Sequence, residues 1–286
     1  MVHMAPPDSS LPVAVFDSGV GGLTVLHECL VSLPHEDFVY LGDTARFPYG
    51  ERSAEELRSF ALELSDLLVD EGAKLLVVAC NSATSAALPA LRERFAGRLR
   101  VVGVVEPESR LAAATTRNGS VGLLATPATV ASGAYARALA REAPEATLHA
   151  VPCPTLAPLI QRGGEVDDAV VSAVEGYCEP LREAGVDTVI LGCTHYPLVR
   201  PLLQRTLGRG VEIISSGEAI AEEVERALDE EGLAREDTRR GSYRFLCSGR
   251  PEAFRALGTR FLQLPLGAVA AVDVASAFAA PGSQAA

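Results

Sequence analysis

Short runs of apolar residues alternate along this chain with longer stretches in which apolar residues recur at helical spacing. The runs predicted as strands are residues 13–16, 38–41, 75–79, 101–105, 121–124, 148–151, 188–191 and 211–214. The clearest helical stretches are residues 53–70, 83–95, 129–141, 167–184 and 218–230. Strands that are apolar throughout and separated by helices form parallel sheets covered on both faces. The pattern therefore predicts an α/β protein.

Composition narrows the kinds of partner that this chain can have. It has 286 residues, 48% of them hydrophobic, which is enough for a sizeable core. The formal net charge of −12 is spread along the sequence, which argues against a nucleic-acid surface. The sequence contains no apolar run long enough to span a membrane, and residues 1–10 lack the pattern of a signal peptide. We expect a cytoplasmic protein with a small-molecule partner, and neither nucleic acid nor membrane as a partner.

The six cysteines are spread widely along the chain. They lie at positions 29, 80, 153, 178, 193 and 247. Because none forms a C-x-x-C pair, we predict free thiols and not a disulfide framework. A zinc site needs clustered Cys and His ligands, and a pair such as Cys193 and His195 is too few for one. We therefore expect no metal site.

Polar loops follow several of the predicted strands. The loops are DSGVGG after residue 16, GDTARFPYG after 41, CNSAT after 79, ATPAT after 124 and GCTHYP after 191. Ligands of parallel α/β sheets bind beyond the carboxyl ends of the strands. The hydroxyl and amide groups of these loops, together with helix N-terminal amides, suit the carboxylates of a small acid.

Two of these strand ends have the same form. KLLVVACNSAT (74–84) and DTVILGCTHYP (187–197) both run from a charged residue through apolar residues to a small residue, a cysteine and polar groups. Either Cys80 or Cys193 alone is best interpreted as a buried core residue, since free cysteine is often buried. Found together, they predict two similar lobes that each contribute one reactive thiol to a cleft between them.

Two opposed thiols suit the inversion of a stereocentre. One group removes a proton from one face of a carbon and the other returns a proton to the opposite face, and a thiol with a pKa of roughly 8.5 can do both after a modest shift. A pyridoxal phosphate enzyme needs a Schiff-base lysine, but the only lysine, Lys74, lies at the amino end of its strand. GVGGLT is a poor dinucleotide motif because Thr24 stands at the third glycine position. We expect no cofactor.

Several motifs together resemble the glutamate racemases. They are VFDSGVGGLTV, GDTARFPYG, VVACNSAT, LGCTHYPLV and SSGEAI, in an order and spacing that match from about Pro12 to about Gly258. The resemblance implies a cofactor-independent isomerase that interconverts L- and D-glutamate and supplies the D-isomer for bacterial peptidoglycan. It also implies two α/β lobes with the active site between them.

The resemblance implies roles for individual residues. Cys80 and Cys193 correspond to the two proton donor/acceptors, with Asp17 assisting the first and His195 the second. The residues that correspond to the substrate shell are Asp17, Ser18, Tyr49, Gly50, Asn81, Ser82, Thr194 and His195. Structural alternatives are a helix cap for Asp17 and Ser18 or for Asn81 and Ser82, a turn at Tyr49 and Gly50, and an ordinary polar loop residue for His195.

Two positions depart from the family pattern. Gln161, in CPTLAPLIQRGG, stands where the family commonly has an acidic residue, and a glutamine can orient a partner but cannot carry a proton. Ser82 replaces the commoner threonine and keeps the hydroxyl.

The domain organisation follows from the two-lobe interpretation. We predict a discontinuous first lobe of residues 11–100 and 209–275, a second lobe of residues 101–208, and tails at 1–10 and 276–286. The helix faces do not identify a dimer surface, so a homodimer is carried only as an expectation. Two alternatives stay open: a related racemase or decarboxylase acting on another acid, such as aspartate or a hydantoin, and a non-catalytic two-lobed protein that binds an amino acid.

Overall fold

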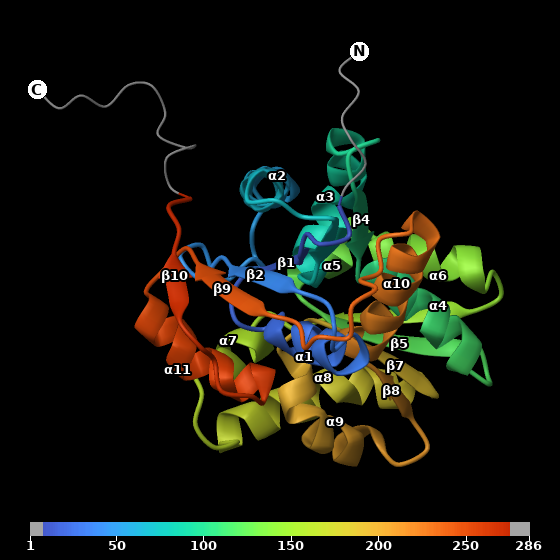
Figure 1. The fold of residues 1–286 in the computed structure, drawn as a ribbon. Helices are drawn as coiled ribbons and strands as arrows, with labels where there is room; N and C mark the ends of the chain where they lie inside the picture. The colour runs from blue at the N-terminus through green and yellow to red at the C-terminus, as the bar shows by residue number, and fades with distance from the viewer. Residues whose placement is uncertain (1–7, 275–286) are drawn as a thin grey trace, which may run out of the picture.

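A computed structural model describes residues 8–274 and contains two parallel sheets (Figure 1). The predicted tails fall outside these residues, apart from residues 8–10. The first sheet has the strand order β10-β9-β2-β1-β3-β4, and the second has the order β6-β5-β7-β8. The strands are β1 (Val13–Asp17), β2 (Phe38–Gly42), β3 (Leu75–Val78), β4 (Arg100–Gly103), β5 (Ser120–Ala125), β6 (Thr147–Pro152), β7 (Thr188–Gly192), β8 (Glu212–Ile214), β9 (Tyr243–Cys247) and β10 (Val269–Ala271).

Helices follow nearly every strand. They are α1 (Leu23–Ser32), α2 (Ala54–Asp70), α3 (Asn81–Arg94), α4 (Val105–Thr115), α5 (Pro127–Ser132), α6 (Ala134–Glu142), α7 (Leu156–Gln161), α8 (Asp168–Glu183), the 3₁₀ turn η1 (Tyr196–Val199), α9 (Arg200–Leu207), α10 (Ser216–Glu231) and α11 (Pro251–Leu262). Within the described residues no helix is long and apolar enough to cross a membrane. The α/β prediction is confirmed.

The central strands of the first sheet, β1, β2 and β3, are buried on both faces, which explains their continuous apolar runs. Side chains alternate along β1, so that Val13 and Val15 pack into one core while Ala14 and Phe16 pack into the other. Helices α2 and α3 cover the face of Ala14 and Phe16, and α1 lies against the opposite face (Figure 1). Both faces are therefore closed to water, as a parallel sheet requires.

The chain passes between the two sheets twice. It leaves the first sheet after β4 to form α4, and it returns from β8 through α10 to β9. Strand β4 pairs with β3, and β8 pairs with β7. The predicted lobe boundaries at 100/101 and 208/209 are therefore corrected by sheet membership: β4 belongs to the first sheet and β8 to the second. The pairing partner of a strand depends on tertiary contacts that its own apolar run does not specify.

All the predicted strands are present, with small shifts at their ends, and two other strands were not predicted. The predicted strand 101–105 stops at Gly103 because α4 begins at Val105. The predicted helix 129–141 is two helices, since Gly133 adopts a left-handed conformation with φ of 65° between α5 and α6. Strands β9 and β10 complete one edge of the first sheet.

Candidate active site

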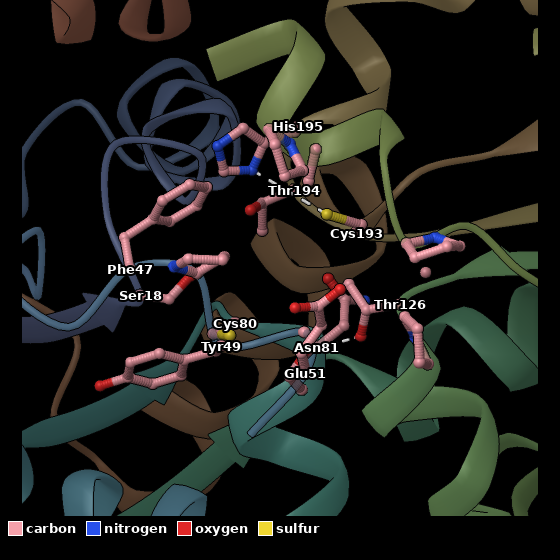
Figure 2. Close-up of a pocket in the computed structure, with 18 residues that line it drawn as sticks. Ser18, Phe47, Tyr49, Glu51, Cys80, Asn81, Thr126, Cys193, Thr194 and His195 are labelled. Carbon is pink, nitrogen blue, oxygen red and sulfur yellow. Dashed lines mark hydrogen bonds between the residues drawn. The ribbon is translucent and has the colours of Figure 1, made fainter. Parts of the chain in front are cut away.

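A cavity lies where loops from the carboxyl ends of the two sheets meet (Figure 2). It is lined by Ser18, Phe47, Pro48, Tyr49, Gly50, Glu51, Cys80, Asn81, Ser82, Thr126, Pro127, Pro154, Ala157, Pro158, Gly192, Cys193, Thr194 and His195. All the predicted site residues except Asp17 are in this lining. The lining contains no lysine or arginine, so any carboxylate bound here is held by amide and hydroxyl groups.

Cys80 occupies the N-cap of α3, directly after β3. Its sulfur accepts a hydrogen bond from the Ala83 backbone amide at 3.5 Å. Burial raises the pKa of the Cys80 thiol to about 12, and the Asp17 carboxylate acts in the same direction, while hydrogen bonds from Ala83 and Ser18 oppose the rise. The N-terminus of a helix stabilises a thiolate. A nearby cation would be needed as well, to offset the unfavourable effect of burial on the charged sulfur.

Asp17 ends β1 beneath the cavity wall and is fully buried. Its carboxylate accepts hydrogen bonds from the Gly19 amide at 3.0 Å and from the Thr194 hydroxyl at 3.4 Å. Burial raises the pKa of Asp17 from 3.8 to about 6, although these hydrogen bonds lower it. The residue thus joins the first-sheet loop to the second cysteine motif. The Asp17 carboxylate also accepts a hydrogen bond from the Gly22 backbone amide at the start of α1, so Asp17 caps this helix as well as contacting Thr194.

Cys193 follows β7 in the second sheet, and His195 lies beside it (Figure 2). Nδ1 of His195 is 3.9 Å from Sγ of Cys193, and Nε2 of His195 is 2.6 Å from Oε1 of Gln161. When Nε2 donates to Gln161, Nδ1 carries no proton and faces the thiol as an acceptor. Burial lowers the pKa of His195 to about 3 and raises the pKa of Cys193 well above its usual value. The imidazole is therefore neutral at physiological pH.

The glycines of DSGVGG bring the first-sheet loop into contact with the second cysteine motif. A Cβ atom on Gly21 would lie 2.3 Å from Oγ1 of Thr194 and 2.5 Å from the His195 ring. The Thr24 hydroxyl donates to the backbone oxygen of Thr194 at 3.1 Å. Close approach of two polypeptide segments, and not phosphate binding, explains why a glycine is needed here.

Three hydroxyl groups form a cluster at the other side of the cavity. Oγ of Ser82 lies 2.9 Å from Oγ1 of Thr126 and 3.2 Å from Oγ1 of Thr129, and the two threonine hydroxyls are 3.0 Å apart. Thr126 is the N-cap of α5 and lines the cavity. It was not among the predicted site residues, although ATPAT was one of the loops noted after a strand. A hydroxyl residue between a buried strand and a proline was the available signal.

Gly50 brings the first-sheet loop against α5. A Cβ atom there would lie 2.9 Å from Cβ of Thr126, and the Gly50 carbonyl accepts a hydrogen bond from the Ala128 amide at 2.9 Å. The Tyr49 hydroxyl donates to the buried carboxylate of Asp43, outside the cavity lining. Tyr49 and Gly50 are therefore more than an exposed turn.

Two parallel sheets with a thiol from each on one cavity define a two-lobed α/β enzyme of the isomerase class. Residues 24–224 match the family model described as Asp/Glu/Hydantoin racemase. The chain is 46% identical over 264 residues to a glutamate racemase of Beutenbergia cavernae, a match that covers 89% of this chain and 90% of that protein.

Solved structures give the same result. The glutamate racemase isoform RacE1 of Bacillus anthracis superposes with a TM-score of 0.87 at 38% identity, covering 92% of this chain and 97% of that one. The glutamate racemase of Francisella tularensis, solved in complex with D-glutamate, has a TM-score of 0.87 at 30% identity and covers 94% and 99% of the two chains. The chain belongs to the Asp/Glu/hydantoin racemase family and, within it, to the glutamate racemases.

Proposed function

We propose that this protein interconverts L- and D-glutamate by proton transfer at the α-carbon, without a cofactor. The observation that carries the proposal is the placement of Cys80 and Cys193, which come from different sheets and line one cavity. One thiolate takes the α-proton, and the other cysteine, as a thiol, delivers a proton to the opposite face of the carbon. Electron density that accumulates on the α-carbon and its carboxylate is stabilised by the amide and hydroxyl donors around the cavity.

Each cysteine has a different assistant. His195 presents Nδ1 to the Cys193 thiol at 3.9 Å and orients it as a hydrogen-bond acceptor. Asp17 acts on Cys80 through the electrostatic field, and its pKa near 6 makes it a stronger base than an exposed carboxylate. Burial disfavours a thiolate at either position, so the ammonium group of bound glutamate supplies the positive charge that offsets this cost.

Recognition of the substrate rests on neutral groups. Oδ1 of Asn81 is buried and has no hydrogen-bond partner among the described residues, which suits it to accept a bond from the substrate ammonium. Ser18, Ser82 and Thr194 provide hydroxyls for the carboxylates.

In bacteria this reaction supplies D-glutamate for peptidoglycan, and we place the protein in the cytoplasm. The homodimer expected from the sequence stays a prediction, which light scattering of the purified protein tests.

Solvent exchange tests the proposal directly. The purified protein in D₂O, without added cofactor, should incorporate deuterium at the α position of both glutamate isomers and convert either to the racemate. Cys80→Ala and Cys193→Ala should each abolish conversion, whereas Cys178→Ala, which removes a buried thiol outside the cavity, should retain it. A fully active Cys80→Ala protein would exclude the two-base mechanism.

A substrate panel separates the alternatives. Aspartate and hydantoins should react much more slowly than glutamate if the proposal holds. A binding protein without activity would retain its affinity for glutamate after thiol alkylation and would exchange no deuterium.

A further inference from the structure

A carboxylate that is fully buried lies behind Asn81, outside the cavity lining. Glu108 is in the first turn of α4, and its side chain is 0% exposed. It makes no ion pair among the described residues. Oε2 accepts hydrogen bonds from Nδ2 of Asn81, at 3.3 Å, and from the Tyr135 hydroxyl, while Oε1 accepts one from the Ser216 hydroxyl.

Glu108 and its three partners come from four separate helices. Asn81 begins α3, Tyr135 is on α6, and Ser216 begins α10. Helices α4 and α10 lie on the two passages of the chain between the sheets. The Glu108 carboxylate therefore joins both passages to the N-terminal turn of α3, immediately beside Cys80.

The hydrogen bonds determine which way the Asn81 amide faces. Nδ2 of Asn81 donates to Glu108 and also to the Tyr135 hydroxyl, at 2.7 Å, so both of its N–H groups have acceptors. The Tyr135 hydroxyl in turn donates to Glu108. Rotation of the amide by 180° would place Oδ1 against the carboxylate and lose these bonds. The oxygen is thus left for the ligand, and the nitrogen is held behind the cavity.

We propose that Glu108 is a positioning residue that orients the Asn81 amide so that Oδ1 accepts a hydrogen bond from the substrate ammonium. The inference rests on the proposed function for the identity of the substrate. Glu108 does not touch the substrate itself. Burial raises the pKa of Glu108 from 4.5 to about 7, because a charged carboxylate is disfavoured away from water. Titratable groups with strongly shifted pKa values are typical of functional sites.

The proposal makes a selective prediction about ligands. Glu108→Leu introduces an apolar side chain of similar size and removes both carboxylate oxygens, including the one that accepts from Nδ2 of Asn81, so the affinity for glutamate should fall about tenfold or more. Glutarate, which has the two carboxylates but no ammonium group, should bind equally well to the wild type and to the variant. Glu108→Gln retains an acceptor for Asn81 and should restore the affinity for glutamate to within about threefold.

Two further variants control for folding and for charge. Tyr135→Phe keeps Glu108 and the packing but removes one of the two acceptors of Nδ2. It should lower the affinity for glutamate, by less than Glu108→Leu does, and leave the affinity for glutarate unchanged. Glu106 is on the same helix, and its carboxylate pairs with Arg92 at the surface. Glu106→Leu should change the affinity for neither glutamate nor glutarate.

Isothermal titration calorimetry with glutamate and glutarate measures these affinities without requiring turnover. Equal losses for glutamate and glutarate in Glu108→Leu and in Tyr135→Phe would overturn the proposal, as would unchanged binding of glutamate. Failure of the proposed racemase function would instead appear as absence of α-proton exchange in the wild type. In the active wild type and variants, a rise in KM for glutamate larger than the fall in kcat is the expected kinetic result.

Discussion

Replacing Gln161 by alanine should reduce racemisation because it releases the ring of His195. The 2.6 Å bond between Nε2 of His195 and Oε1 of Gln161 favours the tautomer in which Nδ1 faces Cys193 without a proton. Without that acceptor, the tautomer loses its bond and leaves a buried N–H group unpaired, at a cost of about 1–3 kcal/mol. If this cost falls on the competent tautomer, kcat/KM decreases by a factor of about 5 to 150.

The equilibrium constant of the reaction constrains how this loss can appear. Enantiomers have equal free energies, so kcat/KM must fall by the same factor in both directions. The isotope effects are not constrained in this way. Proton transfer to and from Cys193 becomes more rate-limiting, so the isotope effect of an α-deuterium should rise for the isomer whose proton Cys193 removes and fall for the other.

The assay is racemisation of α-deuterated and unlabelled L- and D-glutamate, followed by circular dichroism. Gln161→Glu, which keeps an acceptor oxygen, should retain activity within a few-fold. Gln204→Ala is the matched control, since the Gln204 side-chain amide donates to the Gly208 and Val211 carbonyls and lies outside the cavity lining. Isotope effects that change equally in both directions would refute a role for Gln161 through His195 and Cys193.

Three further changes test other parts of the structure. Gly21→Ala should lower kcat/KM about a hundredfold by displacing Thr194 and His195, whereas Gly176→Ala, where a Cβ meets no atom within 4 Å, should not. Lys74→Ala removes one partner of the buried Lys74–Glu36 pair, with its 2.5 Å contact, and should lower the free energy of unfolding in urea by about 3–5 kcal/mol. The pKa of Asp17 is raised in the folded state, so its contribution to stability is complete below pH 4 and is lost as the pH rises through 6. Relative to wild type, Asp17→Asn should therefore gain about 2 kcal/mol of unfolding free energy between pH 4 and pH 7; a constant difference would contradict the raised pKa.

The sequence predicts the buried strands well because burial on both faces leaves a continuous apolar run. Strand β9 was missed since its first residues, Tyr243 and Arg244, are not buried, and β10 is a three-residue edge strand whose residues are not buried. The change of sheet at β4 and β8 depends on which neighbour each strand finds, and no local pattern records that choice.

The candidate site could be located from the sequence for a related reason. Parallel strands bring their carboxyl ends to one edge of a sheet, so the residues after β1 and β3 lie together. The residues after β7 join them because the second sheet meets the first at the carboxyl ends of its strands. The position of Asp17 below the cavity wall and the contact of Gln161 with His195 depend on loop geometry. Glu108 gives no signal in the sequence, because a glutamate in the first turn of a helix is usually an exposed residue that favours the helix dipole.

The absence of lysine and arginine from the cavity lining has a consequence for how the protein responds to salt. A site that holds carboxylates with guanidinium groups loses affinity as salt screens the ion pairs. In the proposed site the carboxylates are instead held by directional hydrogen bonds from neutral donors, which ions in solution hardly weaken. The protein and its substrate are both anionic, so screening reduces their mutual repulsion during encounter. Raising the salt concentration should therefore leave the KM for glutamate unchanged or lower it.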